Sequence, residues 1–263
     1  SNRKMRIGGK IFENYTYIMG IINLTPDSFF APSRKSEYNI LKTAEKMIED
    51  GASVLDIGAQ STRPNYSEVS ADEEIRRFEK PLKMIKSRFD IPVSVDTYFS
   101  ESAEAALSSG ADMINDVWGL TRGEGMAEII ARYNASVCIM HNAKQKLTGD
   151  IFPQIIKFLS DSVEIALKSG IGRDRICLDG GIGFAKDRDQ NFELLYNYSK
   201  LNAQGYPLLI GTSRKSMFGG AVEDRLKPTL ESTAKAVEQG VLFVRVHDVK
   251  ENAEVIERLY GRN

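Results

Sequence analysis

The fold is decided by the stretch Asn39-Ile-Leu-Lys-Thr-Ala-Glu-Lys-Met-Ile-Glu-Asp50-Gly51-Ala-Ser-Val54-Leu-Asp-Ile57, which holds a helix, a stop and a strand in direct succession. Apolar residues recur with the period of a helix as far as Asp50, whereas Val54–Ile57 is a short, mainly apolar run typical of a buried strand. Gly51 lies just past the helix, where a glycine supplies the left-handed cap. The stretch therefore predicts a helix that leads directly into a buried strand.

The same succession of helix, glycine and strand recurs along the chain. Further junctions are Ser109-Gly110-Ala111, Ser169-Gly170-Ile171 and Gln239-Gly240-Val241. The predicted strands are Ile18–Ile22, Val54–Ile57, Val93–Val95, Met113–Ile114, Val137–Met140, Ile176–Leu178, Leu208–Ile210 and Phe243–Val246. The predicted helices are Asn39–Asp50, Ala71–Phe89, Ser100–Ser109, Glu124–Tyr133, Phe152–Ser169, Gln190–Ala203, Leu230–Gln239 and Asn252–Tyr260. Such alternation predicts a parallel sheet that is covered by helices.

The length of the chain favours a closed barrel over an open sheet. Eight βα units typically occupy about 250 residues, and the chain has 263. We therefore predict an α/β fold, a single (β/α)8 TIM barrel that occupies residues 1–263 as one domain. Met5–Phe12, which contains Gly8-Gly9, is predicted to form a short N-terminal β-hairpin that plugs the bottom of the barrel.

Charge and composition exclude several classes of protein. The chain has 35 Lys and Arg against 36 Asp and Glu, a net charge of −1, and lacks the clustered basic excess of a nucleic-acid binder. Its longest apolar stretch, Tyr17–Leu24, is shorter than the roughly 20 residues that span a bilayer. Cys138 and Cys177 have no Cys-x-x-Cys spacing, which argues against zinc and redox chemistry. We expect a cytoplasmic protein that binds neither nucleic acid nor membrane.

Polar residues follow the end of every predicted strand, where the loops of a TIM barrel carry the chemistry. Taken singly, an Asp in such a place is often only a loop cap, so the argument depends on the coincidence at all eight strands. One group provides two carboxylates, an amide and a cation, which suits the edge of a nitrogen-rich heterocycle. Its members are Asp96, Asn115, Asp179 and Lys215.

A second group suits a phosphate or a diphosphate. Arg245 and His247 lie two residues apart and therefore face the same way, and Asn23 ends the neighbouring first strand. Arginine binds a phosphate through two parallel hydrogen bonds, whereas histidine can also hand over a proton. A Mg²⁺ ion could bind through Asn23 and the phosphates of a substrate.

Other polar residues have structural interpretations. Asp56, in the middle of a strand, is interpreted as a hydrogen-bond partner, Asp116 and Asp248 as helix caps, and His141 as a residue of the barrel wall. A P-loop is rejected because Arg214 occupies the place where a glycine should precede the lysine. No nucleophile elbow and no His-Glu-x-x-His motif occurs in the sequence.

Nine segments occur in order over nearly the whole chain. They are Met19-Gly-Ile-Ile-Asn-Leu-Thr-Pro-Asp-Ser-Phe29, Asp56-Ile-Gly58, Ser61-Thr-Arg-Pro64, Val95-Asp-Thr97, Asn115-Asp-Val117, Met140-His141, Asp179-Gly-Gly-Ile-Gly-Phe184, Gly211-Thr-Ser-Arg-Lys-Ser216 and Arg245-Val-His-Asp-Val249. Together they resemble the motifs of the dihydropteroate synthase family of pterin-binding TIM barrels. The first and the eighth segment are the most specific, and their joint presence leaves little room for chance.

The resemblance implies a transferase of folate biosynthesis. Members of the family condense 6-hydroxymethyl-7,8-dihydropterin diphosphate with p-aminobenzoate and release 7,8-dihydropteroate and pyrophosphate. Carried over residue by residue, the pterin contacts are Asp96, Asn115, Asp179 and Lys215, and the diphosphate contacts, together with Mg²⁺, are Asn23, Arg245 and His247. Thr62, Arg63, Pro64, Phe184, Ser213 and Lys215 would surround the p-aminobenzoate, and Lys215, Arg245, His247 and Asp96 would be catalytic.

The resemblance also implies properties outside the barrel mouth. The loops Thr25–Lys35 and Gln60–Glu68 would be mobile lids that order over the substrates. The family forms homodimers through its outer helices and is a target of sulfonamides. Four positions depart from the usual pattern, namely Gln60, Asn65, Gly180 and Ala185, where the family commonly has Glu, Gly, Pro and Gly. They put loop dynamics and inhibitor response in doubt more than activity.

Two rival functions use a similar barrel. A methyltransferase that takes a methyl group from methyltetrahydrofolate to a corrinoid protein shares a pterin pocket but has no use for a diphosphate site, so Arg245 and His247 count against it. A non-catalytic pterin-binding barrel would be expected to lose Asn23, Lys215, Arg245 or His247, and all four are present.

Overall fold

The structure is a computed structural model that describes residues 4–25, 34–60 and 67–261. Eight parallel strands close into a barrel in the order β10-β3-β4-β5-β6-β7-β8-β9. The strands are β3 (Tyr17–Asn23), β4 (Ala52–Gly58), β5 (Val93–Asp96), β6 (Met113–Asp116), β7 (Ser136–Met140), β8 (Ile176–Asp179), β9 (Leu208–Ile210) and β10 (Phe243–Val246). The predicted α/β barrel and its eight strands are confirmed.

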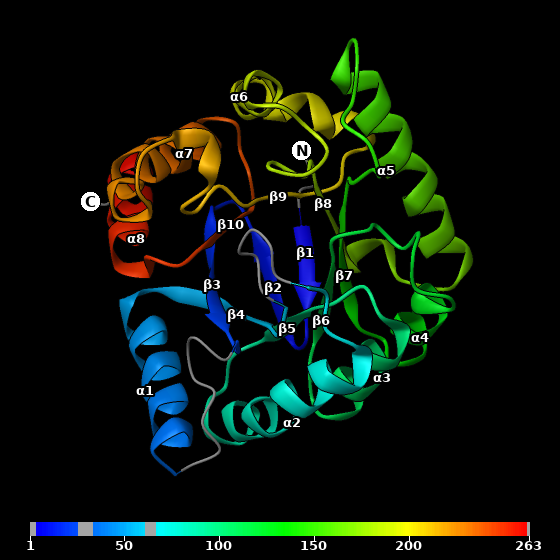
Figure 1. The fold of residues 1–263 in the computed structure, drawn as a ribbon, viewed down its shortest axis with the longest axis vertical. Helices are drawn as coiled ribbons and strands as arrows, with labels where there is room; N and C mark the ends of the chain where they lie inside the picture. The colour runs from blue at the N-terminus through cyan, green and yellow to red at the C-terminus, as the bar shows by residue number, and fades with distance from the viewer. Residues whose placement is uncertain (1–3, 26–33, 61–66, 262–263) are drawn as a thin grey trace.

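Helices lie around the outside of the strands (Figure 1). They are α1 (Arg34–Asp50), α2 (Ala71–Arg88), α3 (Ser100–Ser108), α4 (Met126–Arg132), α5 (Ile151–Lys168), α6 (Arg188–Tyr196), α7 (Leu226–Glu238) and α8 (Val249–Leu259). Short 3-10 helices are η1 (Arg173–Arg175), η2 (Tyr198–Gln204), η3 (Ser216–Phe218) and η4 (Val222–Asp224). Among the described residues, none of the helices combines the length and the hydrophobicity that a membrane span requires.

Several helix bounds differ from the sequence-based expectation. The helix predicted over Gln190–Ala203 is divided, because the chain leaves helical geometry at Asn197 (φ −127°, ψ 29°) between α6 and η2. The turn directs Tyr198 into the core, where it is fully buried. Helices α1, α7 and α8 begin three to five residues earlier than predicted. Their first turns carry few apolar residues, so periodicity alone does not reveal them.

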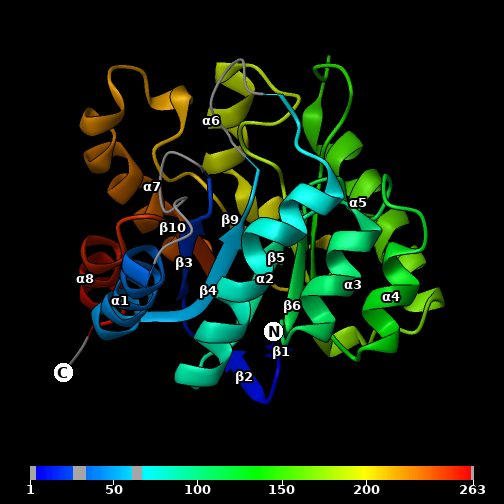
Figure 2. The same cartoon turned by 60° about the horizontal axis from the view of Figure 1, so that its bottom comes forward.

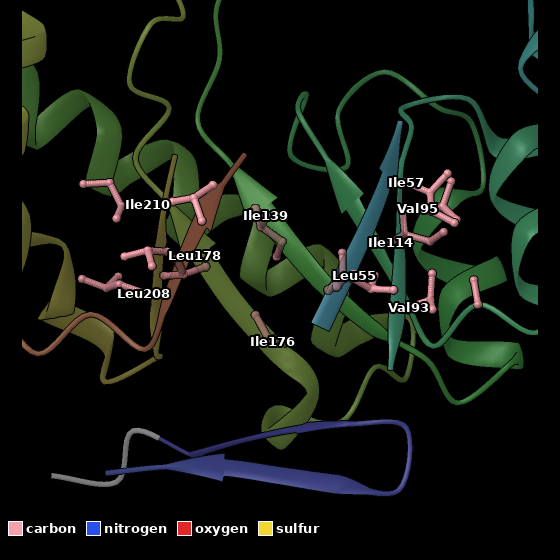
Figure 3. Close-up of a cluster of buried hydrophobic side chains, with 14 of the residues drawn as sticks. Leu55, Ile57, Val93, Val95, Ile114, Ile139, Ile176, Leu178, Leu208 and Ile210 are labelled. Carbon is pink, nitrogen blue, oxygen red and sulfur yellow. The ribbon is translucent and has the colours of Figure 1, made fainter. Parts of the chain in front are cut away.

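Side chains along each strand alternate between the helices and the barrel axis. Leu55 and Ile57 of β4 belong to the large cluster that packs against the surrounding helices, together with residues such as Val93 and Val95 of β5 (Figure 3). Val54, one position along β4, belongs to a separate cluster inside the barrel. Because successive side chains of a strand point to opposite faces, every second residue reaches the axis. The position of an axial side chain is therefore set by its place along the strand.

A hairpin seals one end of the barrel. It is formed by β1 (Lys4–Ile7) and β2 (Lys10–Glu13), which pair antiparallel around a two-residue turn in which Gly8 adopts φ +59°. Figures 2 and 3 show it beneath the strands, at their amino-terminal ends. Its buried residues Met5, Ile7 and Phe12 join the axial cluster, and the ring centroid of Phe12 lies 5.3 Å from that of Phe243 in β10. The predicted hairpin and its plugging role are confirmed.

Candidate active site

Polar side chains occupy the axial positions at the end of the barrel opposite the hairpin. Asp56 follows Val54 by two residues on β4, and Asp179 and Arg245 follow Cys177 and Phe243 in the same way on β8 and β10. The two-residue period of the strands thus converts an apolar lower layer into a charged upper layer. Asp96 and Asn115, which are neighbours in the register of β5 and β6, complete this layer.

Arg245 is the centre of the upper layer. Its Nε donates a hydrogen bond of 2.6 Å to Oδ2 of Asp56, and its Nη2 donates one of 3.2 Å to Oδ2 of Asp96. Asp56 is fully buried, and its second oxygen accepts a hydrogen bond of 2.5 Å from the Ser94 hydroxyl. The structural interpretation of Asp56 is confirmed. Arg245 therefore contacts the carboxylate that was assigned to the heterocycle, which links the two predicted groups.

Asp179 lies on the other side of the axis. Its Oδ1 accepts hydrogen bonds from the Gly181 backbone N–H at 2.8 Å and from the Tyr198 hydroxyl at 3.2 Å. Lys215, on the loop after β9, places its Nζ 4.8 Å from the ring centroid of Phe184. This geometry is that of a cation–π contact. The ring of Phe184 and the head of Lys215 therefore lie side by side, as expected if both border one ligand.

The enclosure of this layer changes the acidity of its groups. Burial raises the pKa of Asp96 to about 7, although the Arg245 guanidinium acts in the opposite direction. Burial also raises the pKa of Asp179, against the hydrogen bond from Gly181 and the charge of Lys215. Burial and the charge of Arg245 lower the pKa of Lys215 to about 8. Strongly shifted groups that share one cavity mouth are typical of functional sites.

Two amide side chains are available for ligands. Asn115 is 3% exposed and stands at the third position of β6, next to Asp96 in the register of β5 and β6. Asn23 is half-buried at the end of β3. Its Oδ1 and the Asp96 side chain lie on either side of Gly58, where a Cβ would be 3.8 Å from both. A side chain at position 58 would fill this gap.

The residues around Asn23 fit a magnesium ion that arrives with a substrate. Within the described ranges, no group of three or more His, Cys, Asp or Glu residues could hold a metal by itself. Mg²⁺ is commonly bound by one or two protein oxygens, with water and substrate phosphates as its other ligands. The single amide oxygen of Asn23 suits that second arrangement.

His247 and Ser213 lie together at the ends of β10 and β9. Ser213 Oγ is 2.8 Å from Nδ1 of His247 and accepts a hydrogen bond of 3.1 Å from the His247 backbone N–H. Burial, followed by the charges of Arg214 and Arg245, lowers the pKa of His247 to about 4. Ser213 was expected beside p-aminobenzoate, but the contacts of its hydroxyl are with His247.

Two predicted helix caps have other roles. Asp248 precedes α8, yet its carboxylate makes no cap hydrogen bond and instead accepts two hydrogen bonds from Arg214, at 3.2 and 2.8 Å. Asp116 accepts from the backbone N–H groups of Trp118 and Leu120, and so caps a turn well before α4 begins. The cap interpretation was wrong for both because a nearer partner takes each carboxylate.

Sequence reasoning gave no role to Lys186, which fastens the loop after β8. Its buried Nζ donates hydrogen bonds to Gly181 O at 3.0 Å and Phe184 O at 2.8 Å, and lies 2.8 Å from His141 Nδ1. His141 is 2% exposed, which confirms it as a wall residue. The available signal was a lysine directly after a strand-end loop rich in glycine, where backbone carbonyls are close at hand.

Two departures from the family pattern, Gln60 and Gly180, have structural explanations, and a third, Ala185, has none. Gln60 pairs with both the N–H and the C=O of Val69, at 3.0 and 2.9 Å, and donates to the buried Glu74 at 2.8 Å. The Gly180 N–H donates to the Tyr198 hydroxyl at 2.8 Å, a bond that a proline could not make. Ala185 adopts φ +57°, a conformation that favours glycine.

Several predicted residues lie outside the described ranges. Thr62, Arg63 and Pro64, expected around p-aminobenzoate, are among them, as is Asn65. The same applies to most of the two expected lids, since the structure describes only the ends of Thr25–Lys35 and Gln60–Glu68.

The barrel and its charged mouth define the class of protein. The family model described as pterin binding enzyme matches residues 19–247, and the chain belongs to that family. Within it, the chain is similar to dihydropteroate synthases. It is 43% identical over 257 residues to that of Clostridium beijerinckii, covering 95% of this chain and 96% of the relative. It is 36% identical to that of Bacillus subtilis, covering 94% of this chain and 89% of the relative.

Solved structures agree with this assignment. A dihydropteroate synthase from Clostridium difficile, crystallised in the presence of pteroic acid, matches with a TM-score of 0.91 and 42% identity, over 95% of this chain and 99% of that one. The enzyme from Xanthomonas albilineans with 4-aminobenzoic acid matches with a TM-score of 0.91 and 30% identity, over 99% of this chain and 98% of that one.

Proposed function

We propose that the protein is a dihydropteroate synthase, a transferase that joins 6-hydroxymethyl-7,8-dihydropterin diphosphate to p-aminobenzoate. The observation that carries the proposal is the upper axial layer with Asp96, Asn115, Asp179 and Arg245, together with Lys215 on the loop after β9, in a chain whose relatives bear that name. In the reaction, the C–O bond between the pterin methylene and the diphosphate breaks. A C–N bond to the aromatic amine forms, and the amine loses one proton.

The polar layer suits the pterin. Carboxylates at Asp96 and Asp179 can accept hydrogen bonds from ring N–H and amino groups, while Asn115 and Lys215 can donate to a carbonyl oxygen or a ring nitrogen. Both carboxylates favour positive charge on the pterin as the leaving group departs. A side-chain nucleophile is not required, which agrees with a site built from acids, amides and cations.

The cations suit the leaving group. We propose that His247 contacts the diphosphate and that Arg245 stabilises the charge that develops on it. Asn23 would hold a Mg²⁺ ion, which, when bound to the diphosphate, would neutralise part of that charge. The ring of Phe184 beside Lys215 supports a place for the aromatic amine there, next to the loop that carries Ser213.

The corrinoid methyltransferase is the weaker alternative. A methyl transfer leaves no diphosphate to hold, whereas this chain places Lys215, Arg245 and His247 around one mouth. The relatives named above are dihydropteroate synthases as well.

The test is a coupled assay for pyrophosphate. Release is expected only when the pterin diphosphate, p-aminobenzoate and Mg²⁺ are all present, and each omission should abolish it. Folded protein that binds pterin but releases no pyrophosphate from the complete mixture would contradict the proposal. Methyl transfer from methyltetrahydrofolate to a corrinoid protein, measured on the same preparation, would support the alternative.

The assembly and location implied by the family resemblance belong to the same proposal. We infer a cytoplasmic homodimer, and sedimentation of the purified protein would test the dimer. A monomer at micromolar concentration would contradict it.

A further inference from the structure

Ser213 and His247 are joined by two hydrogen bonds in one small ring of atoms. The His247 backbone N–H donates to Ser213 Oγ at 3.1 Å, and the same Oγ lies 2.8 Å from Nδ1 of the His247 ring. Ser213 is 6% exposed, so water has little access to its hydroxyl. The hydroxyl therefore satisfies its hydrogen-bonding capacity with His247 itself.

The position of one hydrogen follows from this geometry. A hydroxyl has a single hydrogen to donate and lone pairs with which to accept. If Nδ1 carried the ring hydrogen, Ser213 Oγ would receive two donors, and its own hydrogen would have no acceptor among the residues that the structure describes. If Nδ1 is bare, the hydroxyl donates to it and every group is paired. The second arrangement avoids a buried unsatisfied donor and leaves the ring hydrogen on Nε2.

His141 provides an internal comparison. Its Nδ1 lies 2.8 Å from Nζ of Lys186, whose pKa is lowered by burial to about 7. The two histidines of the chain therefore have different partners at Nδ1, an amine that titrates for His141 and a hydroxyl for His247. They differ in surroundings, because His141 is 2% exposed and packs against Phe158, whereas His247 is half-buried and borders the groove between α1 and the start of α8. Of the two histidines, His247 is the more accessible.

We propose that Ser213 is a positioning residue, which holds His247 as the neutral tautomer with hydrogen on Nε2 so that this nitrogen donates a hydrogen bond to the substrate diphosphate. The inference depends on the proposed function for the identity of the anion, but not for the tautomer. Burial and the charges of Arg214 and Arg245, which lower the pKa of His247 to about 4, keep the ring neutral near pH 7.

This tautomer decides between two roles for His247. A neutral ring with hydrogen on Nε2 has no lone pair at that nitrogen, so it cannot accept the proton that the aromatic amine releases. His247 therefore acts as a hydrogen-bond donor to the leaving group and not as the base of the reaction.

The direct test is nitrogen NMR of the protein labelled with ¹⁵N-histidine. Since the chain has two histidines, a His247→Gln variant assigns the remaining signals to His141. In the wild type we expect His247 to show a protonated Nε2 and a bare Nδ1. In Ser213→Ala we expect averaged signals from both tautomers, and Ser213→Thr, which keeps the hydroxyl, should restore the wild-type pattern. Thr212→Val is the matched control, because that neighbouring buried hydroxyl bonds to Ser232.

Calorimetry measures the consequence for binding. Pterin diphosphate with Mg²⁺ and free 6-hydroxymethylpterin are each titrated into the variants without p-aminobenzoate, so that no reaction occurs. Ser213→Ala should bind the diphosphate about fivefold to tenfold more weakly, the loss of about one net hydrogen bond, and should bind free pterin as the wild type does.

Each outcome decides the proposal. A wild-type spectrum with hydrogen on Nδ1 overturns it without any variant, as does a Ser213→Ala spectrum identical to that of the wild type. Equal loss of affinity for both ligands overturns the assignment of the diphosphate as the acceptor. If the wild type shows the expected tautomer but releases no pyrophosphate in the complete assay, the proposed function fails while the role of Ser213 as the residue that sets the tautomer stands.

Discussion

The lower and upper ends of the barrel interior are built on the same strands, two residues apart. On β4, β8 and β10 the lower positions carry Val, Cys and Phe, and the upper positions carry Asp, Asp and Arg. The lower layer is closed by a hairpin and is mainly apolar, although on β5 the lower position is the buried Ser94, whose hydroxyl lies 3.8 Å from Met19 Sδ. The upper layer holds ionisable groups whose pKa values are shifted by burial. A step of two residues therefore separates the part that stabilises the barrel from the part that we propose binds the pterin.

The comparison has an energetic side. Burying apolar side chains is favourable, whereas taking charged groups out of water is costly unless they are paired. Arg245 lowers that cost by bridging Asp56 and Asp96. Burial of the lower layer therefore stabilises the fold, whereas burial of the charged upper layer destabilises it. Substitutions in the lower layer should mainly change the free energy of unfolding, and substitutions in the upper layer should mainly change the affinity for pterin.

The largest effect is expected for Phe12→Ala in the hairpin. The Phe12 ring is 4% exposed and packs edge-on against Tyr17 and Phe243, so its removal leaves a cavity under the barrel. The free energy of unfolding should fall by about 3–5 kcal/mol, as measured by urea denaturation. Affinity for pterin should be unchanged at a temperature where the variant is folded.

Ile11→Ala on the same strand is the matched control. Ile11 is 45% exposed, so its truncation should change the free energy of unfolding by less than about 0.5 kcal/mol. A large loss of pterin affinity in folded Phe12→Ala protein would show that the two ends are coupled, contrary to the comparison.

Asp179→Asn should have the reverse effect, a large loss of pterin affinity with little change in the free energy of unfolding. Replacing a charged acceptor by an amide is expected to weaken pterin binding about 100-fold, or about 2.7 kcal/mol, in calorimetric titrations. The free energy of unfolding should change by less than about 1 kcal/mol, because the amide oxygen can still accept from Gly181 and Tyr198. Asp161→Asn, on the exposed ion pair with Lys157, should leave both quantities unchanged. If Asp179→Asn bound pterin with wild-type affinity, Asp179 would have only a structural role.

A smaller effect is expected from pH. Asp96 accepts hydrogen bonds as a carboxylate, so pterin affinity should rise as pH increases through about 7, by up to tenfold per unit below it. Above a pH of about 8, Lys215 loses its charge and affinity should fall again. Asp96→Asn should flatten the acidic limb of this bell and move the alkaline limb to lower pH, because the Asp96 charge raises the pKa of Lys215. A profile that is level between pH 6 and 9 would contradict the assignment of both groups.

Much of the division between an apolar lower layer and a polar upper layer could be predicted from the sequence. The strands and the hairpin were identified from local patterns, and a position at the ends of predicted strands placed Asp96, Asn115 and Asp179 at the mouth without knowledge of tertiary contacts. Such signals are local, because period and glycine caps depend on neighbouring residues.

The pairings could not be predicted. Arg245 bonds to Asp56, 189 residues away, although its spacing from His247 suggested a shared role at the diphosphate. Lys186 contacts His141, and Ser213 contacts His247, and in each pair the two residues follow different strands. Which of several nearby acceptors a long side chain reaches depends on the directions of strand ends around the barrel axis, and these are set by closure of the whole sheet.

Closure of the sheet has a consequence for the order in which the chain is made. The last strand, β10, pairs with β3 and packs on the hairpin, and Thr16 bonds to Val241 across 225 residues. During synthesis, the free edge of β3 and the apolar face of the hairpin lack their β10 partner until almost the whole chain has left the ribosome. An unpaired strand edge is a template for other chains, and long-range pairings form slowly. A chain that ends before Phe243 should therefore aggregate, although it would contain all four proposed pterin contacts.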